Sequence, residues 1–203
     1  MLDSRTASLI RVSTLASRPD FKSELTEELR RVKESSSAER AELYEVCLQS
    51  YLFAGFPAAL ESVRVLSKVF GPEPGEIEIP GSMIGAYQKY AISGEALYKK
   101  VYAANAQKVR EEMIRLSPEL AAWAMIEGYG KTLSRGQLDV KTRELCIVAM
   151  LTQLGWERQL YSHILGARNM GADAAQIAEA ARIGAKGDAT KEKMAEQLIK
   201  KIV

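Results

Sequence analysis

Residues 139–171, DVKTRELCIVAMLTQLGWERQLYSHILGARNMG, decide the fold of this chain. Apolar residues recur every three or four positions on both sides of Gly155, which is the spacing of helices with a buried face. Gly155 interrupts the two runs, and Gly171 is a natural stop for the second. Asp139 is a suitable N-cap for the first run. The stretch therefore predicts a hairpin of two helices.

One polar residue interrupts an apolar stripe on each predicted helix. On the first helix it is the carboxylate Glu144, and on the second it is His163, the sole histidine of the chain. The first stripe consists of Val140, Glu144, Ile147, Leu151 and Leu154, and the second of Trp156, Leu160, His163, Ala167 and Met170. Both polar side chains are therefore expected on faces that are buried.

Folding the hairpin at Gly155 brings Glu144 and His163 close to one level. Glu144 lies 11 residues before Gly155 and His163 lies 8 after it, which at ~1.5 Å per residue gives heights of roughly 16 and 12 Å. Because an isolated buried charge costs several kcal/mol, such groups pair or change protonation. We predict a Glu144–His163 pair that shares a proton. Spacing alone also allows a helix clamp without chemistry, and the first helix is apolar nearly all round.

The rest of the sequence is also predicted to be helical. Alternating β-branched residues are nearly absent, while good helix formers dominate. Further helix starts are indicated by Ser36 with Glu39, by Ser117 before Pro118, and by Asp173 with Gln176. The fold class is therefore all-α.

Residues 71–83, GPEPGEIEIPGSM, are predicted to be an ordered connector because three prolines and three glycines fall there. A short extended piece around Ile77 and Ile79 is compatible with this segment. The connector divides the chain into residues 1–70, which contain the segment AGFPAA, and residues 84–203, which carry the Glu–His pair. The predicted helices of the two parts have a similar order and spacing. This similarity predicts two degenerate repeats, of which the first lacks a histidine.

The composition limits the classes of partner and the cellular compartment that we expect. Because the 28 basic residues are nearly balanced by 26 acidic ones, a surface for nucleic acid or anionic membranes is not expected. No run reaches the ~18 apolar residues of a membrane span, and no signal peptide is indicated. Cys47 and Cys146 lie far apart in apolar surroundings, without zinc or Cys-x-x-Cys spacing. We therefore expect buried thiols in a cytoplasmic protein.

The glycine-punctuated segment EGYGKTLSRGQLD, residues 127–139, is predicted to be a loop leading into the Glu144 helix. Loops that feed a rigid helix often hold substrate-binding groups, which makes Tyr129 and Arg135 candidates. Arg135 suits a carboxylate-bearing ligand through paired hydrogen bonds, although a surface salt bridge explains it equally well. The segment lacks the phosphate-loop pattern. A single histidine without a carboxylate cluster predicts no metal, and no cofactor motif is present.

Residues 138–180 resemble the core of the carboxymuconolactone decarboxylase family, which includes the alkylhydroperoxidase D-type proteins. Arg143-Glu144-Leu145 and the spacing of His163, Ala167 and Gly171 carry the likeness. Residues 42–70 resemble the family's next segment through Gly55, Pro57, Ala58 and Ala59, although here that segment comes first. The likeness covers about residues 38–70 and 117–182. It implies an antiparallel helical bundle that forms homo-oligomers.

The peroxidase branch of the family uses a Cys-x-x-Cys, to which a glutamate and a histidine relay protons. Glu144 and His163 match that relay, but the two cysteine positions hold Trp156 and Gln159. Without these thiols, disulfide-based peroxide reduction cannot run as it does there. Cys146 does not replace them, since it points about 200° away from Glu144 around the helix.

The decarboxylase branch needs no cysteines and no cofactor, and it implies a small-molecule substrate such as a carboxylated lactone. On this hypothesis His163 delivers a proton and Glu144 sets its tautomer. Arg135, with Tyr129, would hold the substrate, and Trp156 would form an apolar wall. Alternatives are an antioxidant protein that lacks the Cys-x-x-Cys and a non-catalytic helical binding module.

Overall fold

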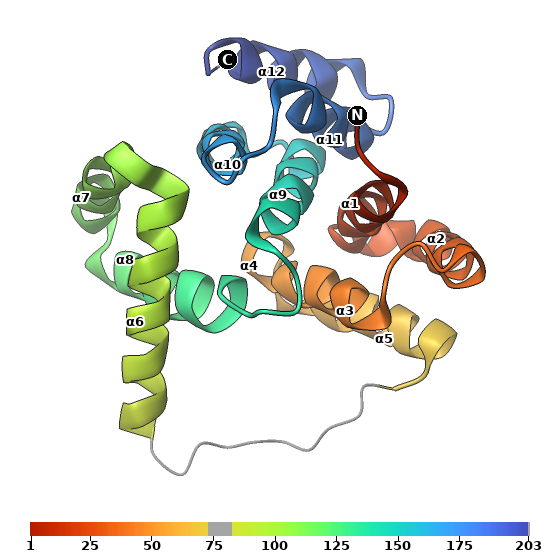
Figure 1. Ribbon diagram of the computed structural model, residues 1–203, viewed down its shortest axis with the longest axis horizontal. Helices are drawn as coiled ribbons and strands as arrows, with labels where there is room; N and C mark the ends of the chain where they lie inside the picture. The colour runs from red at the N-terminus through yellow and green to blue at the C-terminus, as the bar shows by residue number, and fades with distance from the viewer. Residues whose placement is uncertain (73–82, 203) are drawn as a thin grey trace. The chain divides into compact units, whose positions relative to one another are not determined.

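The computed structural model describes residues 1–72 and 83–202, which form helices joined by turns (Figure 1). No strand occurs in these two ranges, so the all-α prediction is confirmed. The α-helices are α1 Ser4–Ala16, α2 Lys22–Ser35, α3 Arg40–Gln49, α4 Tyr51–Ala54, α5 Phe56–Phe70, α6 Met83–Tyr102, α7 Ala106–Leu116, α8 Pro118–Trp123, α9 Val140–Leu154, α10 Glu157–Asn169, α11 Ala174–Ala185 and α12 Ala189–Lys200. Single 3₁₀ turns cover Pro19–Phe21 and Ala103–Asn105, and a π-helix covers Ala124–Leu133.

The contacts divide the chain into two compact units. Unit 1 joins Met1–Glu73 to Gln137–Val203, and unit 2 is Pro74–Gly136. These units differ from the predicted halves, because residues 1–70 pack with α9–α12 and residues 84–136 form a unit of their own. The relation of the two halves as repeats stays a prediction. Most of the predicted connector 71–83, including Ile77 and Ile79, lies outside the described residues.

Unit 1 is built around α9. All residues from Thr142 to Gln153 are buried, as expected for a helix that is apolar nearly all round. Helices α1, α10 and α11 pack against it (Figure 1). The hydroxyl of Ser13 on α1 donates to the carbonyl of Cys146, at 2.8 Å. The N-terminal helices therefore belong to the same core as the predicted hairpin.

The predicted starts and stops of the hairpin are confirmed. The Asp139 side chain accepts a hydrogen bond from the backbone of Thr142, and Gly155 ends α9 in the left-handed conformation. Asp173 and Gln176 form the expected reciprocal cap of α11. Ser117 likewise caps α8.

The predicted capping box of Ser36 and Glu39 is wrong. Glu39 is itself the N-cap of α3, and its partner is Glu42, whose side chain accepts from the Glu39 backbone. Ser36 ends α2 instead, with φ of 50°. Ser36 thus caps the C-terminus of α2, and Glu39 caps the N-terminus of α3. A Ser-x-x-Glu match does not distinguish a C-cap followed by an N-cap from a single capping box.

In unit 2, helix α6 packs closely against the π-helix. A Cβ atom at Gly94 would lie 2.1 Å from the carbonyl oxygen of Met125, and one at Gly130 would lie 2.0 Å from that of Tyr90. Only glycine permits so close an approach of two helix backbones. Three buried tyrosines, Tyr98, Tyr102 and Tyr129, lie between these helices in mutual ring contact.

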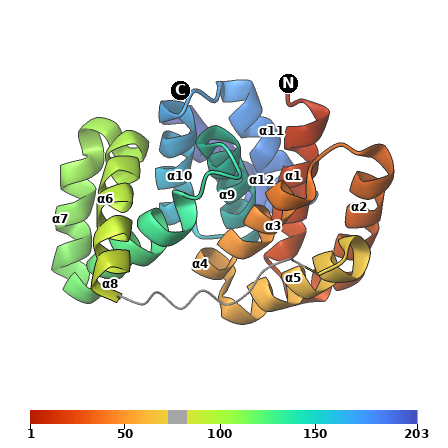
Figure 2. The ribbon, with the colours of Figure 1, turned by 60° about the horizontal axis from the view of Figure 1, so that its bottom comes forward.

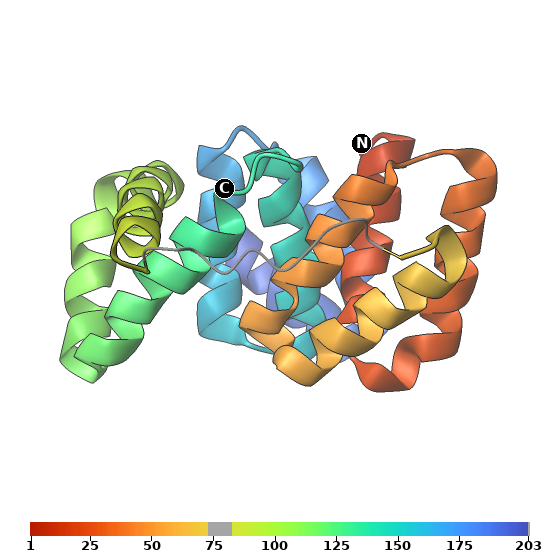
Figure 3. The same cartoon turned by 90° about the horizontal axis from the view of Figure 1, so that it is seen from below.

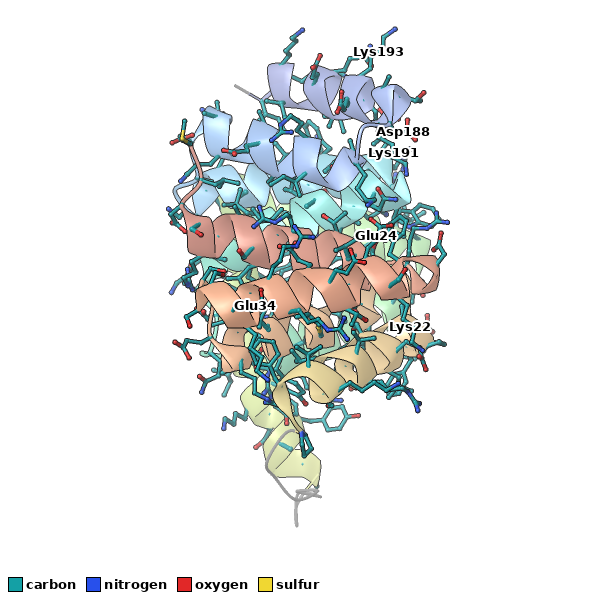
Figure 4. The ribbon with its side chains drawn as sticks, turned by 90° about the vertical axis from the view of Figure 1, so that its right-hand side faces the viewer. Lys22, Glu24, Glu34, Asp188, Lys191 and Lys193 are labelled. Atoms are coloured by element: carbon teal, nitrogen blue, oxygen red, sulfur yellow. The ribbon has the colours of Figure 1, made fainter. Side chains whose placement is uncertain are left out.

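The charged side chains are spread over helix surfaces. Figure 4 labels Lys22, Glu24 and Glu34 on α2 and Asp188, Lys191 and Lys193 at α12, so both signs occur on one side of unit 1. Asp188 caps α12 and lies 3.8 Å from the Lys191 ammonium. Among the described residues, we find no helix with both the length and the apolar character of a membrane span.

Replacing Gly184 by alanine should destabilise unit 1. The new Cβ would lie 2.2 Å from the carbonyl oxygen of Ala149 on α9, so α9 and α11 would have to separate. We expect a loss of about 1–3 kcal/mol, typical of an overpacked core, in urea unfolding followed by circular dichroism. Gly128→Ala is the control, since no atom lies within 4 Å of its Cβ position. Equal stability of the two variants would contradict the close packing of α9 on α11.

Candidate active site

Glu144 of α9 and His163 of α10 form the predicted pair. His163 Nδ1 lies 2.8 Å from Glu144 Oε2, and the two residues are 6% and 2% exposed. The fixed rise of the two helices and the tight turn at Gly155 bring them to one level, as the hairpin argument predicted. The proximity is confirmed, whereas a catalytic role for either residue stays a prediction.

The hydrogen bond fixes which imidazole nitrogen is available for chemistry. Because a carboxylate only accepts hydrogen bonds, Nδ1 of His163 carries the shared proton and donates it to Glu144. Within the described part of the chain, His163 makes no other hydrogen bond. Nε2 therefore accepts a proton when the ring is neutral and donates one when the ring is charged. This is the arrangement that general acid–base catalysis requires.

Phe53 of α4 also contacts the histidine, and it was not predicted from the sequence as a site residue. The ring centroids of Phe53 and His163 are 5.4 Å apart, and the rings are nearly perpendicular at 86°. Figures 2 and 3 show α4 beside α9, in agreement with the contacts between the two helices. Phe53 lies two residues before Gly55, so the segment that carried part of the family resemblance also borders the pair.

A second buried ion pair lies next to the first. Arg143 Nη2 donates to Glu45 Oε2 at 3.0 Å, and both side chains are 1% exposed. Arg143 Nη1 also donates to Gln49 Oε1 at 3.1 Å. Glu45, Gln49 and Phe53 are spaced four apart, so they follow one face of α3 and α4. That face therefore meets both Arg143 and His163.

The amide nitrogen of Gln49 is buried and lacks a hydrogen-bond partner among the described residues. Its oxygen is turned toward the Arg143 guanidinium, which leaves the NH₂ group on the other side of the amide. A buried donor without a partner costs about 1–3 kcal/mol. Neither Glu45 nor Gln49 was singled out from the sequence, because their partner lies almost a hundred residues further along the chain.

The three predicted substrate-binding residues are divided between the two units. Trp156 is the N-cap residue of α10 and is 57% exposed, and no ring contact joins it to His163 in the described residues. Tyr129 and Arg135 belong to unit 2. There Tyr129 is buried and donates to the hydroxyl of Tyr102 at 2.9 Å. The substrate-binding roles of these residues stay predictions.

The two thiols are buried and unbridged, as expected. Burial raises the pKa of Cys47 to about 12, although a hydrogen bond to Ser62 opposes the change. Burial raises the pKa of Cys146 still further above its usual range. Thiol chemistry at neutral pH needs an accessible thiolate, which neither residue supplies. Clusters of three or more potential metal ligands are also missing from the described residues.

Both thiols should resist alkylation in the folded protein. Their raised pKa values keep them protonated, so iodoacetamide at pH 8 should label neither until urea is added. Because the folded pKa values exceed the unfolded ones, the free energy of unfolding should fall as pH rises above about 9. Mass spectrometry and unfolding at pH 8 and pH 10.5 measure both effects. Rapid labelling of the native protein would contradict the buried placement.

Breaking the Arg143–Glu45 pair on one side should destabilise the protein strongly. Glu45→Leu leaves the Arg143 charge buried without the Glu45 carboxylate, and we expect a loss of about 3–5 kcal/mol. The double replacement Arg143→Met with Glu45→Leu removes both charges and should cost clearly less than the sum of the single changes Glu45→Leu and Arg143→Met. Urea unfolding of all four proteins measures the coupling. Additive effects would show that the two side chains do not interact.

Comparison with known proteins supports the resemblance seen in the sequence. Residues 118–195 match the model of the carboxymuconolactone decarboxylase family, and the match includes Glu144 and His163. The chain is also similar to Peroxisomal protein 2 of Schizosaccharomyces pombe, with 29% identity over 143 residues. Those residues are 70% of this chain and 66% of that protein, slightly less than two thirds of its length. Residues 118–195 are therefore similar to the carboxymuconolactone decarboxylase family.

Proposed function

We propose that Glu144 and His163 are the proton-transfer site of a cofactor-free enzyme that acts on a small carboxylated lactone or a related acid. The orientation of the imidazole carries this proposal. Nδ1 is bound to Glu144, so Nε2 is the nitrogen proposed to transfer the proton, and His163 as a residue is 6% exposed. The family match over residues 118–195 supports the substrate class.

Decarboxylation of a carboxylated lactone needs one proton and no cofactor. The bond between the ring carbon and the carboxylate breaks, carbon dioxide leaves, and the electron pair delocalises into the ring as a dienolate. His163 Nε2–H then protonates the dienolate carbon, and the neutral imidazole regains a proton from solvent before the next turnover. Glu144 stabilises the imidazolium form that starts the cycle.

Burial strengthens the action of the pair. Electrostatic attraction between the Glu144 carboxylate and an imidazolium is larger in a site with little water than at the surface. The same exclusion of water favours loss of a carboxylate. Water solvates the localised charge of the carboxylate more strongly than the delocalised charge of the dienolate, so its removal destabilises the starting state more. The low exposure of both residues supports this part of the proposal.

Other parts of the proposal rest on the resemblance. Arg135 would bind the substrate carboxylate or the enolate oxygen, with Tyr129 and Trp156 lining the substrate. We further propose a homo-oligomer located in the cytoplasm, where two free thiols remain reduced. The thiol-based antioxidant function of the family is less well supported, because Trp156 and Gln159 occupy the cysteine positions and both thiols are buried.

His163→Gln should reduce the rate of turnover of γ-carboxymuconolactone, or of a related carboxylated lactone, by a factor of at least ~100. Glutamine keeps the size and polarity of the side chain but cannot carry the transferred proton. Release of carbon dioxide and loss of lactone absorbance measure the rate. Ser162→Ala, on the same helix, is the matched control and should keep the wild-type rate. Wild-type turnover in His163→Gln would overturn the assignment of the proton donor.

A further inference from the structure

The short helix α4 contacts the buried Glu144–His163 pair through Phe53. It comprises four residues, Tyr51–Ala54, none of which is fully buried. It follows α3 at Ser50 and ends at Gly55, whose φ of 90° and ψ of 162° reverse the chain into α5. Phe53 of this helix is itself partly exposed, while the His163 that it contacts is buried.

Phe53 is the residue of α4 that touches the imidazole. The perpendicular arrangement of the rings, with centroids 5.4 Å apart, places the edge of one ring against the face of the other. The other two aromatic rings of this segment, Tyr51 and Phe56, contact each other with centroids 6.3 Å apart. Neither makes a ring contact with His163 in the described residues.

The contact limits what can approach Nε2. Glu144 occupies the Nδ1 side of the imidazole, and the Phe53 ring occupies one flank. A molecule that approaches the imidazole along this flank therefore packs against Phe53. The ring is apolar and flat, so it favours an unsaturated, planar part of a ligand and disfavours the ligand's carboxylate.

We propose that Phe53 covers His163 and determines specificity at this site, where it receives the planar, unsaturated ring of a small carboxylated ligand. Phe53 thus provides an apolar wall beside His163 in addition to Trp156, which is 57% exposed. The substrate part of this inference rests on the proposed function. The cover over His163 rests on the ring geometry alone.

Acylation by diethyl pyrocarbonate, followed at 240 nm, tests the cover, because the chain contains a single histidine. Phe53→Ala should raise the rate of acylation at least fivefold, and Phe53→Leu should give an intermediate rate. Phe56→Ala makes the same change three residues away, at a side chain that is 65% exposed, and should react like wild type. Circular dichroism checks that each variant is folded. A wild-type rate in both Phe53 variants, or an equal rise in Phe56→Ala, would overturn the cover.

Protection by small acids tests the specificity without any enzymatic assay. The probes are 2-furoate, which is planar, and tetrahydro-2-furoate, which has the same charge but a puckered ring. In the wild type, 2-furoate should slow acylation of His163 at a concentration at least fivefold lower than tetrahydro-2-furoate. In Phe53→Ala the two acids should act alike. Equal protection in the wild type would overturn the specificity, whereas failure of carboxymuconolactone turnover alone would overturn only the proposed reaction.

Discussion

The structure depends on one constraint, which is that α9 is buried on every side and yet carries two charged residues in succession. Arg143 and Glu144 are 1% and 2% exposed. Adjacent residues on a helix point about 100° apart, so one partner cannot serve both. Arg143 is paired with Glu45 from the N-terminal helices, and Glu144 with His163 from α10. Arg143 therefore links α9 to the N-terminal helices, and Glu144 links it to the neighbouring α10.

The sequence predicted the Glu144–His163 pair but not the Arg143–Glu45 pair, and the reason is physical. Glu144 and His163 belong to one hairpin, so the rise of a helix and the turn at Gly155 fix their levels. Glu45, Gln49 and Phe53 lie in another part of the chain, and their spacing indicates a shared face without naming what that face meets. Helix ends were predictable where a single cap was involved, as at Asp139. They were not predictable where two helix ends are close together, as around Ser36.

Trp156 and Phe53 show what is missed when residue roles are assigned by matching sequence positions to those of a family. Trp156 occupies a cysteine position of the peroxidase branch, so the resemblance placed it at the reacting group. In the structure it caps α10 and is largely exposed, while Phe53 makes the ring contact with His163. Matching the two cysteine positions draws attention to α10, whereas the ring contact with His163 comes from α4.

A clamp between helices explains the Glu144–His163 pair less well than chemistry does. The turn at Gly155 and the apolar faces of α9 and α10 already fix the hairpin, and a buried ion pair adds little net stability over apolar residues of similar size. A clamp also has no need to leave one imidazole nitrogen without a hydrogen-bond partner among the described residues, whereas proton transfer needs that nitrogen. The Arg143–Glu45 pair, in which Arg143 makes a second hydrogen bond to Gln49, has the form expected of a pair with a structural role. The pair that is bonded on one side only is therefore the one to which we assign the reaction.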